Sequence, residues 1–338
     1  MCYNEEIETM SREELHRLQS ERLVRIVKYT YDNVDFYRKR MDEYHVAPSD
    51  IKSVDDISKL PFMTKQDLRD YYPYGTFAAP AESIVRFHAS SGTTGKPIVA
   101  GYTQKDLDCW SEGVARCLTA YGLTSKDIIQ VSYGYGLFTG GLGAHDGAHR
   151  IGAATLPTSS GNTSKQIMLM KDLGSTALCC TPSYALFLAE SLENDPDTDI
   201  SRDIKLKVGV FGAEPWTENM RKELESKLHI KAYDIYGLTE VSGPGVGGEC
   251  EYQDGTHLWE DMFYPEIIDP VSLQPVPHGS RGELVFTTLL KEGMPVIRYR
   301  TRDLTYLDYS RCKCGRTMVR MGRILGRSDD MLIIRGIN

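Results

Sequence analysis

The chain has 338 residues, of which 41% are hydrophobic and 25% are charged, and its formal net charge is −8. These values are ordinary for a globular protein and exclude a disordered, collagenous or coiled-coil chain. The negative charge argues against a basic nucleic-acid-binding surface, although backbone N–H groups and a few lysines can still bind an anion locally. At about 150 residues per domain, the length predicts roughly two domains.

The first residues, MCYNEEIETM, lack the apolar segment of a signal peptide. No run of the chain approaches the roughly 18 apolar residues that span a bilayer. We therefore expect a cytoplasmic protein without a membrane partner. In that reducing compartment, the eight cysteines favour metal binding over disulfides.

The sequence pattern near the N-terminus is typical of helices, and strand-like segments first occur from residue 84. Apolar residues recur at near-helical spacing through the first 45 residues. Thr64 can cap a short helix that begins at Lys65. Residues 84–90 and 98–103 are predicted to pair as a hairpin around the Gly-rich segment 91–97.

From residue 105 onward, predicted strands alternate with helices. Strands are expected at 127–133, 153–157, 175–182, 205–215 and 231–240, and helices at 105–121, 164–173, 183–193 and 217–228. This alternation predicts a mostly parallel sheet in an α/β domain. After residue 250, strand-like runs separated by Gly/Pro turns predict a β-rich subdomain.

The strongest local motif is Ser90-Ser91-Gly92-Thr93-Thr94-Gly95-Lys96-Pro97. Its glycines, hydroxyls and single lysine suit a loop that wraps phosphate oxygens. It is not a P-loop, because only two residues separate the glycines and Pro97 replaces the required Ser or Thr. A plain Ser/Gly hairpin turn is the alternative.

Four segments occur in the order found in adenylate-forming enzymes, the superfamily of acyl-CoA synthetases, luciferases and adenylation domains. The first is Ser90–Pro97, and the others are Tyr236-Gly237-Leu238-Thr239-Glu240, Tyr299-Arg300-Thr301-Arg302-Asp303 and Gly326-Arg327-Ser328-Asp329-Asp330. Within the superfamily, LPFMTKQDLRDYYPYG, SYGYGLFTGGLGAH, FGAEPW and SDDMLIIRG resemble the phenylacetate–CoA ligase branch. The resemblance covers nearly the whole chain.

The resemblance implies an α/β fold, the large N-terminal domain of such an enzyme, with mostly parallel sheets flanked by helices and a β-rich subdomain. The expected divisions are an N-terminal helical segment (1–83), a nucleotide- and acyl-binding core (84–249), a β-rich subdomain (250–325) and a hinge (326–338) that contains Asp329. The family's small C-terminal domain, with its adenylation lysine, is not matched. We therefore expect the chain alone to bind nucleotide and acyl-adenylate but to turn over poorly.

The activity implied by the resemblance is ATP-dependent activation of an aryl acid, foremost phenylacetate, as acyl-AMP, followed by transfer to CoA. Three alternatives stay open: an indoleacetate-like ligase, an adenylate-forming enzyme with another acceptor, and a non-catalytic nucleotide-binding protein. Expected partners are these small molecules and, because family members are often dimers, a second copy of the chain. No nucleic-acid partner is expected.

The resemblance also implies individual roles. Thr239, Glu240 and Lys96 are expected to be catalytic, with Glu240 holding Mg²⁺. Tyr236 would lie against adenine, and Asp303 and Arg327 would bind the ribose. The full nucleotide-binding set is Ser90, Ser91, Gly92, Thr93, Thr94, Gly95, Lys96, Gly212, Ala213, Glu214, Pro215, Asp234, Tyr236, Gly237, Thr239, Asp303 and Arg327. Each residue also has an ordinary structural role open to it, such as core packing for Tyr236.

The acyl pocket is predicted in the aromatic and glycine-rich segment that follows the 127–133 strand. Its expected residues are Tyr133, Tyr135, Gly136, Phe138, Thr139, Gly140 and Gly141. The alternative is a Gly-rich loop that packs its aromatic rings into the core. His145 and His149 have the spacing of a helical metal pair, but no third ligand is evident, which favours core or pocket-wall histidines.

Two further patterns concern loops and metals. The segment 243–248 formally matches GxGxxG, but no helix pattern follows it, so we predict a loop rather than a dinucleotide site. Cys312 and Cys314 form a CxCG turn which, with Cys250 and His257, predicts a tetrahedral, structural zinc site. Free thiols beside an unrelated histidine are the alternative. Four other cysteines, Cys109, Cys117, Cys179 and Cys180, are expected to be inert core residues.

Overall fold

The computed structural model describes residues 1–90 and 97–329. The predicted phosphate-loop residues Ser91, Gly92, Thr93, Thr94, Gly95 and Lys96 lie outside this range. The chain forms two compact units, and each is described by itself. Unit 1 comprises Met1–Tyr3, Trp110–Leu238 and Ser242–Gln253, and unit 2 comprises Asn4–Cys109, Thr239–Val241 and the chain from Asp254. The four predicted divisions stay predictions.

Unit 1 is built on a mixed sheet. Among its described residues the strand order is β4-β3-β5-β6-β7-β8. Pairing is parallel from β4 to β7 and antiparallel between β7 and β8, which confirms the predicted, mostly parallel α/β core. The strands are β3 (Ile128–Val131), β4 (Ala154–Leu156), β5 (Ala177–Cys180), β6 (Val208–Phe211), β7 (Lys231–Leu238) and β8 (Ser242–Gly248).

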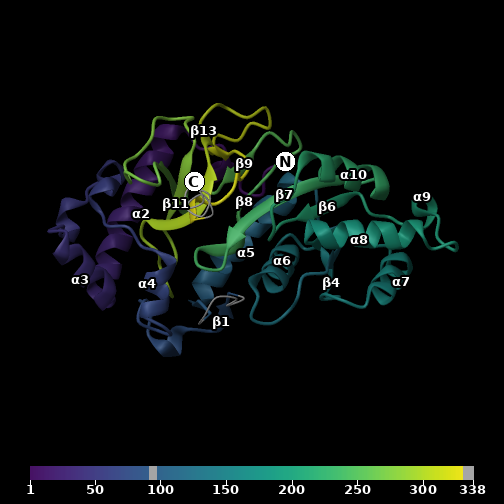
Figure 1. Ribbon diagram of the computed structural model, residues 1–338, viewed down its shortest axis with the longest axis horizontal. Helices are drawn as coiled ribbons and strands as arrows, with labels where there is room; N and C mark the ends of the chain where they lie inside the picture. The colour runs from purple at the N-terminus through teal and green to yellow at the C-terminus, as the bar shows by residue number, and fades with distance from the viewer. Residues whose placement is uncertain (91–96, 330–338) are drawn as a thin grey trace, which may run out of the picture. The chain divides into compact units, whose positions relative to one another are not determined.

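The helices of unit 1 lie between these strands in sequence. They are α6 (Thr139–Arg150), α7 (Thr163–Leu173), α8 (Pro182–Glu193), α9 (Ile200–Asp203) and α10 (Glu218–Leu228), together with α5 (Gln104–Ala120) from Trp110 onward. Of these, α5, α7, α8 and α10 match the predicted helices, whereas α6 and α9 were not predicted. Helix α8 packs between α7 and α10 alongside β6 (Figure 1). Leu188, Leu192, Leu224 and Phe211 are fully buried in this core.

The prediction of a loop at residues 243–248 is wrong, because these residues form β8. The strand pairs with β7, with Gly247 opposite Tyr236 and Gly248 opposite Ile235. Its glycines are explained by packing, since a Cβ on Gly248 would lie 2.3 Å from Tyr121 Oη. The repeated glycines therefore let a strand approach a helix closely.

Helix α6 forms despite its many glycines, which disfavour helix by about 1 kcal/mol each relative to alanine. Two of them face α5. A Cβ on Gly143 would lie 2.6 Å from Trp110, and one on Gly147 would lie 2.3 Å from Val114. Close packing of the two helices thus requires glycine where helix propensity alone would reject it.

Unit 2 combines N-terminal helices with antiparallel sheets. Its helices are α1 (Glu5–Glu8), α2 (Arg12–Asn33), α3 (Asp35–Glu43), η1 (Pro48–Asp50), η2 (Val54–Lys59), α4 (Lys65–Asp70) and η3 (Ala81–Ser83). Helix α4 begins at Lys65 under a Thr64–Asp67 capping box, which confirms the predicted cap. None of the helices in the described part of the chain is long and apolar enough to cross a lipid bilayer.

The strands of unit 2 form three small antiparallel arrangements. The predicted hairpin is confirmed as β1 (Arg86–Ala89) and β2 (Val99–Tyr102). The β-rich C-terminal part contains β9 (Thr256–Leu258), β10 (Phe263–Ile268), β11 (Gly282–Thr288), β12 (Tyr299–Thr305), β13 (Leu307–Asp308) and β14 (Arg320–Met321). Strands β10, β11 and β12 pair in that order, and β14 pairs with both β9 and β13.

Candidate functional site

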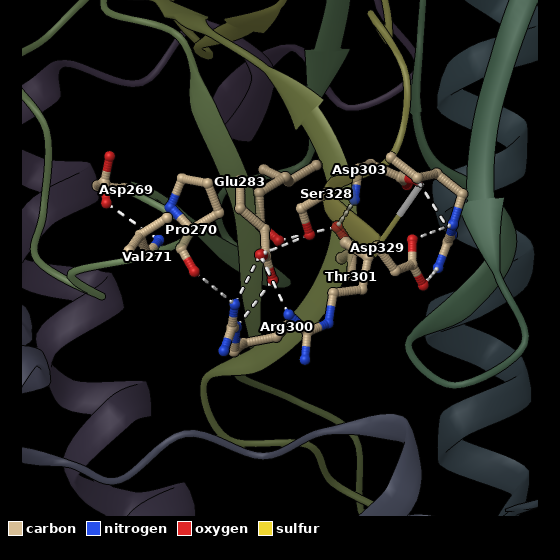
Figure 2. A network of polar contacts seen from close by, with 12 residues as sticks. Asp269, Pro270, Val271, Glu283, Arg300, Thr301, Asp303, Ser328 and Asp329 are labelled. Atoms are coloured by element: carbon tan, nitrogen blue, oxygen red, sulfur yellow. Dashed lines mark hydrogen bonds and ion pairs between the residues drawn. The ribbon is translucent and has the colours of Figure 1, made fainter. Parts of the chain in front are cut away.

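In unit 2, the structure brings Asp303 and Arg327 together. They form an isolated antiparallel bridge, and Arg327 Nη1 lies 3.4 Å from Asp303 Oδ1. Arg327 also donates from Nε and Nη2 to the two carboxylate oxygens of Asp329, each at 3.0 Å (Figure 2). The Arg327 guanidinium and Asp329 carboxylate therefore form a bidentate pair, and this pair, with burial as an opposing effect, lowers the pKa of Asp329.

Glu240 is a nearly buried carboxylate, 5% exposed, in the short 239–241 segment of unit 2. Lys65 Nζ lies 3.2 Å from its Oε1. The capping box at Thr64 and a bridge between Met63 and Tyr299 fix the approach of Lys65. Glu240 thus offers oxygen ligands of the kind that Mg²⁺ prefers, with a lysine beside them.

Lys291 holds the backbone of the same segment. Its Nζ donates to the carbonyl oxygens of Glu240 at 3.2 Å and of Val241 at 2.9 Å. It also lies 4.7 Å from the ring centroid of Tyr102, whose hydroxyl reaches the Thr239 carbonyl at 3.5 Å. Burial lowers the pKa of Lys291 to about 8, against the smaller, opposite influence of Asp106 and Glu240.

This lysine predicts a specific pH dependence of stability. Because its pKa is about 8 in the folded protein, and near 10.4 in an unfolded chain, the unfolded state binds more protons between those values. We expect the free energy of unfolding of the wild type, relative to Lys291→Met, to rise by up to about 1.4 kcal/mol per pH unit above about pH 8. Urea unfolding of both proteins from pH 7 to pH 10 measures this, and a difference that stays flat would contradict it.

In unit 1, the predicted adenine-side loop follows β6 and has a constrained backbone. Ala213 has a φ of +73°, and a Cβ on Gly212 would lie 2.4 Å from the Ile235 carbonyl oxygen. Glu214 Oε1 accepts from the Ser183 backbone N–H at 2.7 Å, at the start of α8. Pro215 follows directly. The segment 212–215 therefore has little freedom to take another shape.

Asp234, Tyr236 and Gly237 lie on β7. Asp234 Oδ1 accepts from Trp216 Nε1 at 3.2 Å, and the Tyr236 side chain is half-buried. A Cβ on Gly237 would lie 2.7 Å from the Cα of Gly243, so the two strands meet without side chains there. This close contact therefore requires glycine at position 237.

The predicted acyl segment divides into buried and accessible residues. Tyr133 is 4% exposed and burial raises its pKa well above the usual range, while Thr139, Gly140 and Gly141 are buried at the start of α6. Tyr135 is half-buried, whereas Gly136 and Phe138 are exposed, Phe138 to 40%. The ring centroids of Tyr133 and Phe138 are 6.4 Å apart. The accessible aromatic surface of this segment therefore comes from Tyr135 and Phe138.

His145 and His149 lie one turn apart on α6, and their ring centroids are 4.3 Å apart. His145 Nδ1 is 3.2 Å from the Tyr135 hydroxyl. Within the described residues, the pair belongs to no group of three or more metal-ligating side chains. His145 therefore contacts the predicted acyl segment through Tyr135, whereas His149 is exposed and is not a core residue.

A cluster of potential metal ligands lies in unit 2. The donor atoms of His257, Cys312 and Cys314 lie within 4.8 Å of one another, and His257 Nε2 is 3.5 Å from Cys314 Sγ. His257 is completely buried, and its Nδ1 has no hydrogen-bond partner among the described residues. Gly315, with a φ of +92°, closes the CxCG turn by donating to the Cys312 carbonyl at 3.1 Å. Two thiols beside the Nε2 of a buried imidazole fit a soft metal ion.

Sequence reasoning missed two site residues, Lys291 and Glu283. Glu283 is completely buried and accepts from both Arg300 and Ser328. Both charges border the largely apolar segment 284–290, and no local motif marks either residue as buried.

Comparison with known proteins identifies relatives of the whole chain. The AMP-binding enzyme family matches residues 8–289. The phenylacetate-coenzyme A ligase of Escherichia coli K12 is 57% identical over 333 residues, 98% of this chain and 75% of the relative. That of Thermus thermophilus is 52% identical over 339 residues, 100% and 76% of the two chains. A solved 2-hydroxyisobutyryl-CoA ligase, with 2-HIB-AMP and CoA, is 30% identical with a TM-score of 0.90, over 95% of this chain and 70% of its own.

Proposed function

Because the chain belongs to the phenylacetate–CoA ligase branch of the AMP-binding enzymes, we propose that it activates phenylacetate with ATP and transfers it to CoA. The observation that carries the proposal is 57% identity over 333 residues to a phenylacetate-coenzyme A ligase. The reaction has two steps. The phenylacetate carboxylate attacks the α-phosphorus of ATP and pyrophosphate leaves, and the CoA thiolate then attacks the acyl carbon and AMP leaves.

The nucleotide-binding residues of unit 2 are proposed to act on the ribose and the phosphates. The Asp303 carboxylate would accept hydrogen bonds from the ribose hydroxyls, supported by Arg327, with which it forms an ion pair at 3.4 Å. Thr239 would donate to the α-phosphate. Ser90, which pairs with Ile98 through its N–H and its hydroxyl, would begin the phosphate loop, and Lys96 would add positive charge.

Glu240 is the proposed magnesium ligand. Its carboxylate and the phosphate oxygens are hard ligands that suit Mg²⁺, and a bound Mg²⁺ would neutralise charge that develops on pyrophosphate. Lys65 Nζ forms an ion pair with the Glu240 carboxylate at 3.2 Å, and Lys291 donates a hydrogen bond to the Glu240 backbone carbonyl. These contacts fix the position of the Glu240 carboxylate. A fixed carboxylate suits a metal ligand better than it suits a solvent-exposed surface charge.

The remaining nucleotide contacts are proposed in unit 1. Tyr236 would lie against adenine, a usual position for an aromatic ring. The constrained loop Gly212-Ala213-Glu214-Pro215, together with Asp234 and Gly237, would form the adenine side. The accessible rings of Tyr135 and Phe138 would contact the aryl group, and Tyr133, Gly136, Thr139, Gly140 and Gly141 would shape the same segment.

A structural zinc ion is a second part of the proposal. His257, Cys312 and Cys314 would be ligands, supported by their mutual approach within 4.8 Å and by His257 Nε2, which lies 3.5 Å from Cys314 Sγ. Cys250, a buried thiol seven residues before His257 in the chain, would complete the tetrahedral set. All four ligands would come from the protein, which is typical of structural zinc.

Zinc content tests this directly. We expect about one zinc per chain in the purified wild type, and strongly reduced zinc together with a lower melting temperature in Cys312→Ser and Cys314→Ser. Cys117→Ser, which replaces a buried cysteine outside the cluster, is the matched control and should keep its zinc. Wild-type protein that contains no zinc would contradict the proposed zinc site.

The proposed enzyme acts in the cytoplasm, as a homodimer, with Asp329 at the hinge. A cytoplasmic location suits cysteines that form no disulfide in the described structure. Small-molecule partners are ATP, CoA and the acid.

Product analysis tests the reaction. With ATP, Mg²⁺, phenylacetate and CoA, the purified full-length protein should form phenylacetyl-CoA and AMP in equal amounts. AMP without a thioester would indicate a different acceptor. A thioester formed only from indoleacetate would replace phenylacetate as the substrate.

A further inference from the structure

The ladder between β11 and β12 is interrupted beside the Asp303–Arg327 pair. Glu283 pairs with Leu304, but Val285 pairs with Arg300, so Thr301, Arg302 and Asp303 leave the regular register. Arg302 has a φ of +72°, a left-handed conformation that non-glycine residues rarely adopt. This bulge redirects the chain at the residue that carries the Asp303 carboxylate.

Hydrogen bonds made by the Thr301 side chain stabilise the bulge. Thr301 Oγ1 donates to the Leu284 carbonyl at 2.8 Å and accepts from the Asp303 N–H at 3.0 Å. At the C-terminal end of the bulge, the Leu304 N–H donates to the Gly326 carbonyl at 2.9 Å, and the Leu325 N–H donates to the Leu304 carbonyl at 2.8 Å. The segment that carries Arg327 is therefore attached to the end of the bulge.

Glu283 joins these parts through its side chain. Its Oε1 accepts from Arg300 Nε at 2.9 Å, and its Oε2 accepts from Arg300 Nη2 at 2.8 Å and from Ser328 Oγ at 2.9 Å (Figure 2). Arg302 Nη1 lies 3.6 Å from the same Oε2. Since Glu283 is completely buried, these charged contacts are strong and costly to lose.

We propose that Glu283 is a positioning residue, which fixes Asp303 and Arg327 in the arrangement that receives the ribose hydroxyls of ATP. The inference rests on the proposed function. Glu283 contacts Arg300 before the bulge, Arg302 within it, and Ser328 immediately after Arg327. It therefore acts on both members of the ribose-binding pair without touching the nucleotide.

The test is ribose discrimination. A site built to hydrogen-bond a hydroxyl rejects a ligand that lacks it, and misplacement of about 1 Å can remove much of that effect. We expect Glu283→Gln and Ser328→Ala to weaken AMP binding in calorimetry by about tenfold while 2′-deoxy-AMP binding changes little. The preference for AMP over 2′-deoxy-AMP would thus fall, and Ser328→Thr, which keeps the hydroxyl, should restore it.

A matched control is available in the same three-stranded sheet. Glu266 on β10 is nearly buried and forms a bidentate pair with Arg298, at 2.9 Å and 3.1 Å. Glu266→Gln should lower the melting temperature but leave the preference for AMP over 2′-deoxy-AMP unchanged. Ser328→Ala keeps the test decisive should Glu283→Gln fail to fold.

The outcomes separate the two claims. Unchanged ribose preference in Ser328→Ala and in folded Glu283→Gln would overturn the positioning role, as would an equal loss in Glu266→Gln. Wild-type protein that prefers AMP over 2′-deoxy-AMP but shows no phenylacetate-dependent ATP–pyrophosphate exchange would overturn the proposed function and leave the positioning role supported. Wild-type protein that binds neither nucleotide would overturn both.

Discussion

Glu240→Gln is expected to lower phenylacetate-dependent ATP–pyrophosphate exchange by about 100-fold or more, the usual effect of removing one group that stabilises transition-state charge. The carboxylate is 5% exposed and lies 3.2 Å from Lys65, so it carries its charge in a largely water-excluded place. Glutamine keeps the shape and one acceptor but loses the charge that would hold Mg²⁺.

Magnesium dependence separates a metal ligand from a merely structural glutamate. The half-saturating Mg²⁺ concentration should rise in Glu240→Gln, while the melting temperature changes little. Glu292→Gln, at a half-exposed glutamate that pairs with Lys105, is the matched control and should keep normal exchange. Exchange within about threefold of the wild type in Glu240→Gln would contradict the role of this carboxylate.

Arg316→Met should lower the free energy of unfolding by about 3–5 kcal/mol, the range for breaking a buried ion pair. Both partners, Glu8 and Arg316, are completely buried, and Arg316 Nε donates to Glu8 Oε2 at 2.7 Å. The Glu8 carbonyl also accepts from the Thr317 N–H at 3.1 Å. The pair therefore attaches α1 to the segment before β14, and its loss leaves a carboxylate buried without its cation.

A double-variant cycle identifies the cause. Glu8→Gln with Arg316→Met should cost less than the sum of the two single changes, because the second change removes the charge that the first one strands. Arg38→Met, in the exposed pair with Asp35, should have little effect. Chemical denaturation measures the four proteins of the cycle and the Arg38→Met control, and additive losses in the cycle would show that the pair is not coupled.

Much of the fold could be predicted because its signals are local. The strand–helix alternation after residue 105 predicted the parallel core, and Thr64 with Asp67 predicted the start of α4. Strand β8 was mistaken for a loop, because its glycines are required by packing against α5, which is distant in sequence. The propensity of glycine for turns could not reveal that contact.

The candidate site also combines residues that local motifs predict with residues that only long-range contacts reveal. Motifs of consecutive residues pointed to Asp303, Arg327 and Glu240, whereas their supports are long-range pairs. Glu283 and Ser328 are 45 positions apart, and Lys291 and Glu240 are 51 apart. Such partners depend on the register of β11 with β12 and on the bulge at Arg302, which no local pattern encodes.

Adenylation of phenylacetate is the first step of the proposed reaction. Exchange of labelled pyrophosphate into ATP by the full-length protein measures this step alone and needs no CoA. We expect exchange that requires phenylacetate and Mg²⁺ and is at least about tenfold weaker with an aliphatic acid of similar length, since an aryl pocket discriminates by apolar contact. Exchange that is absent with phenylacetate, or equally fast without any acid, would contradict it.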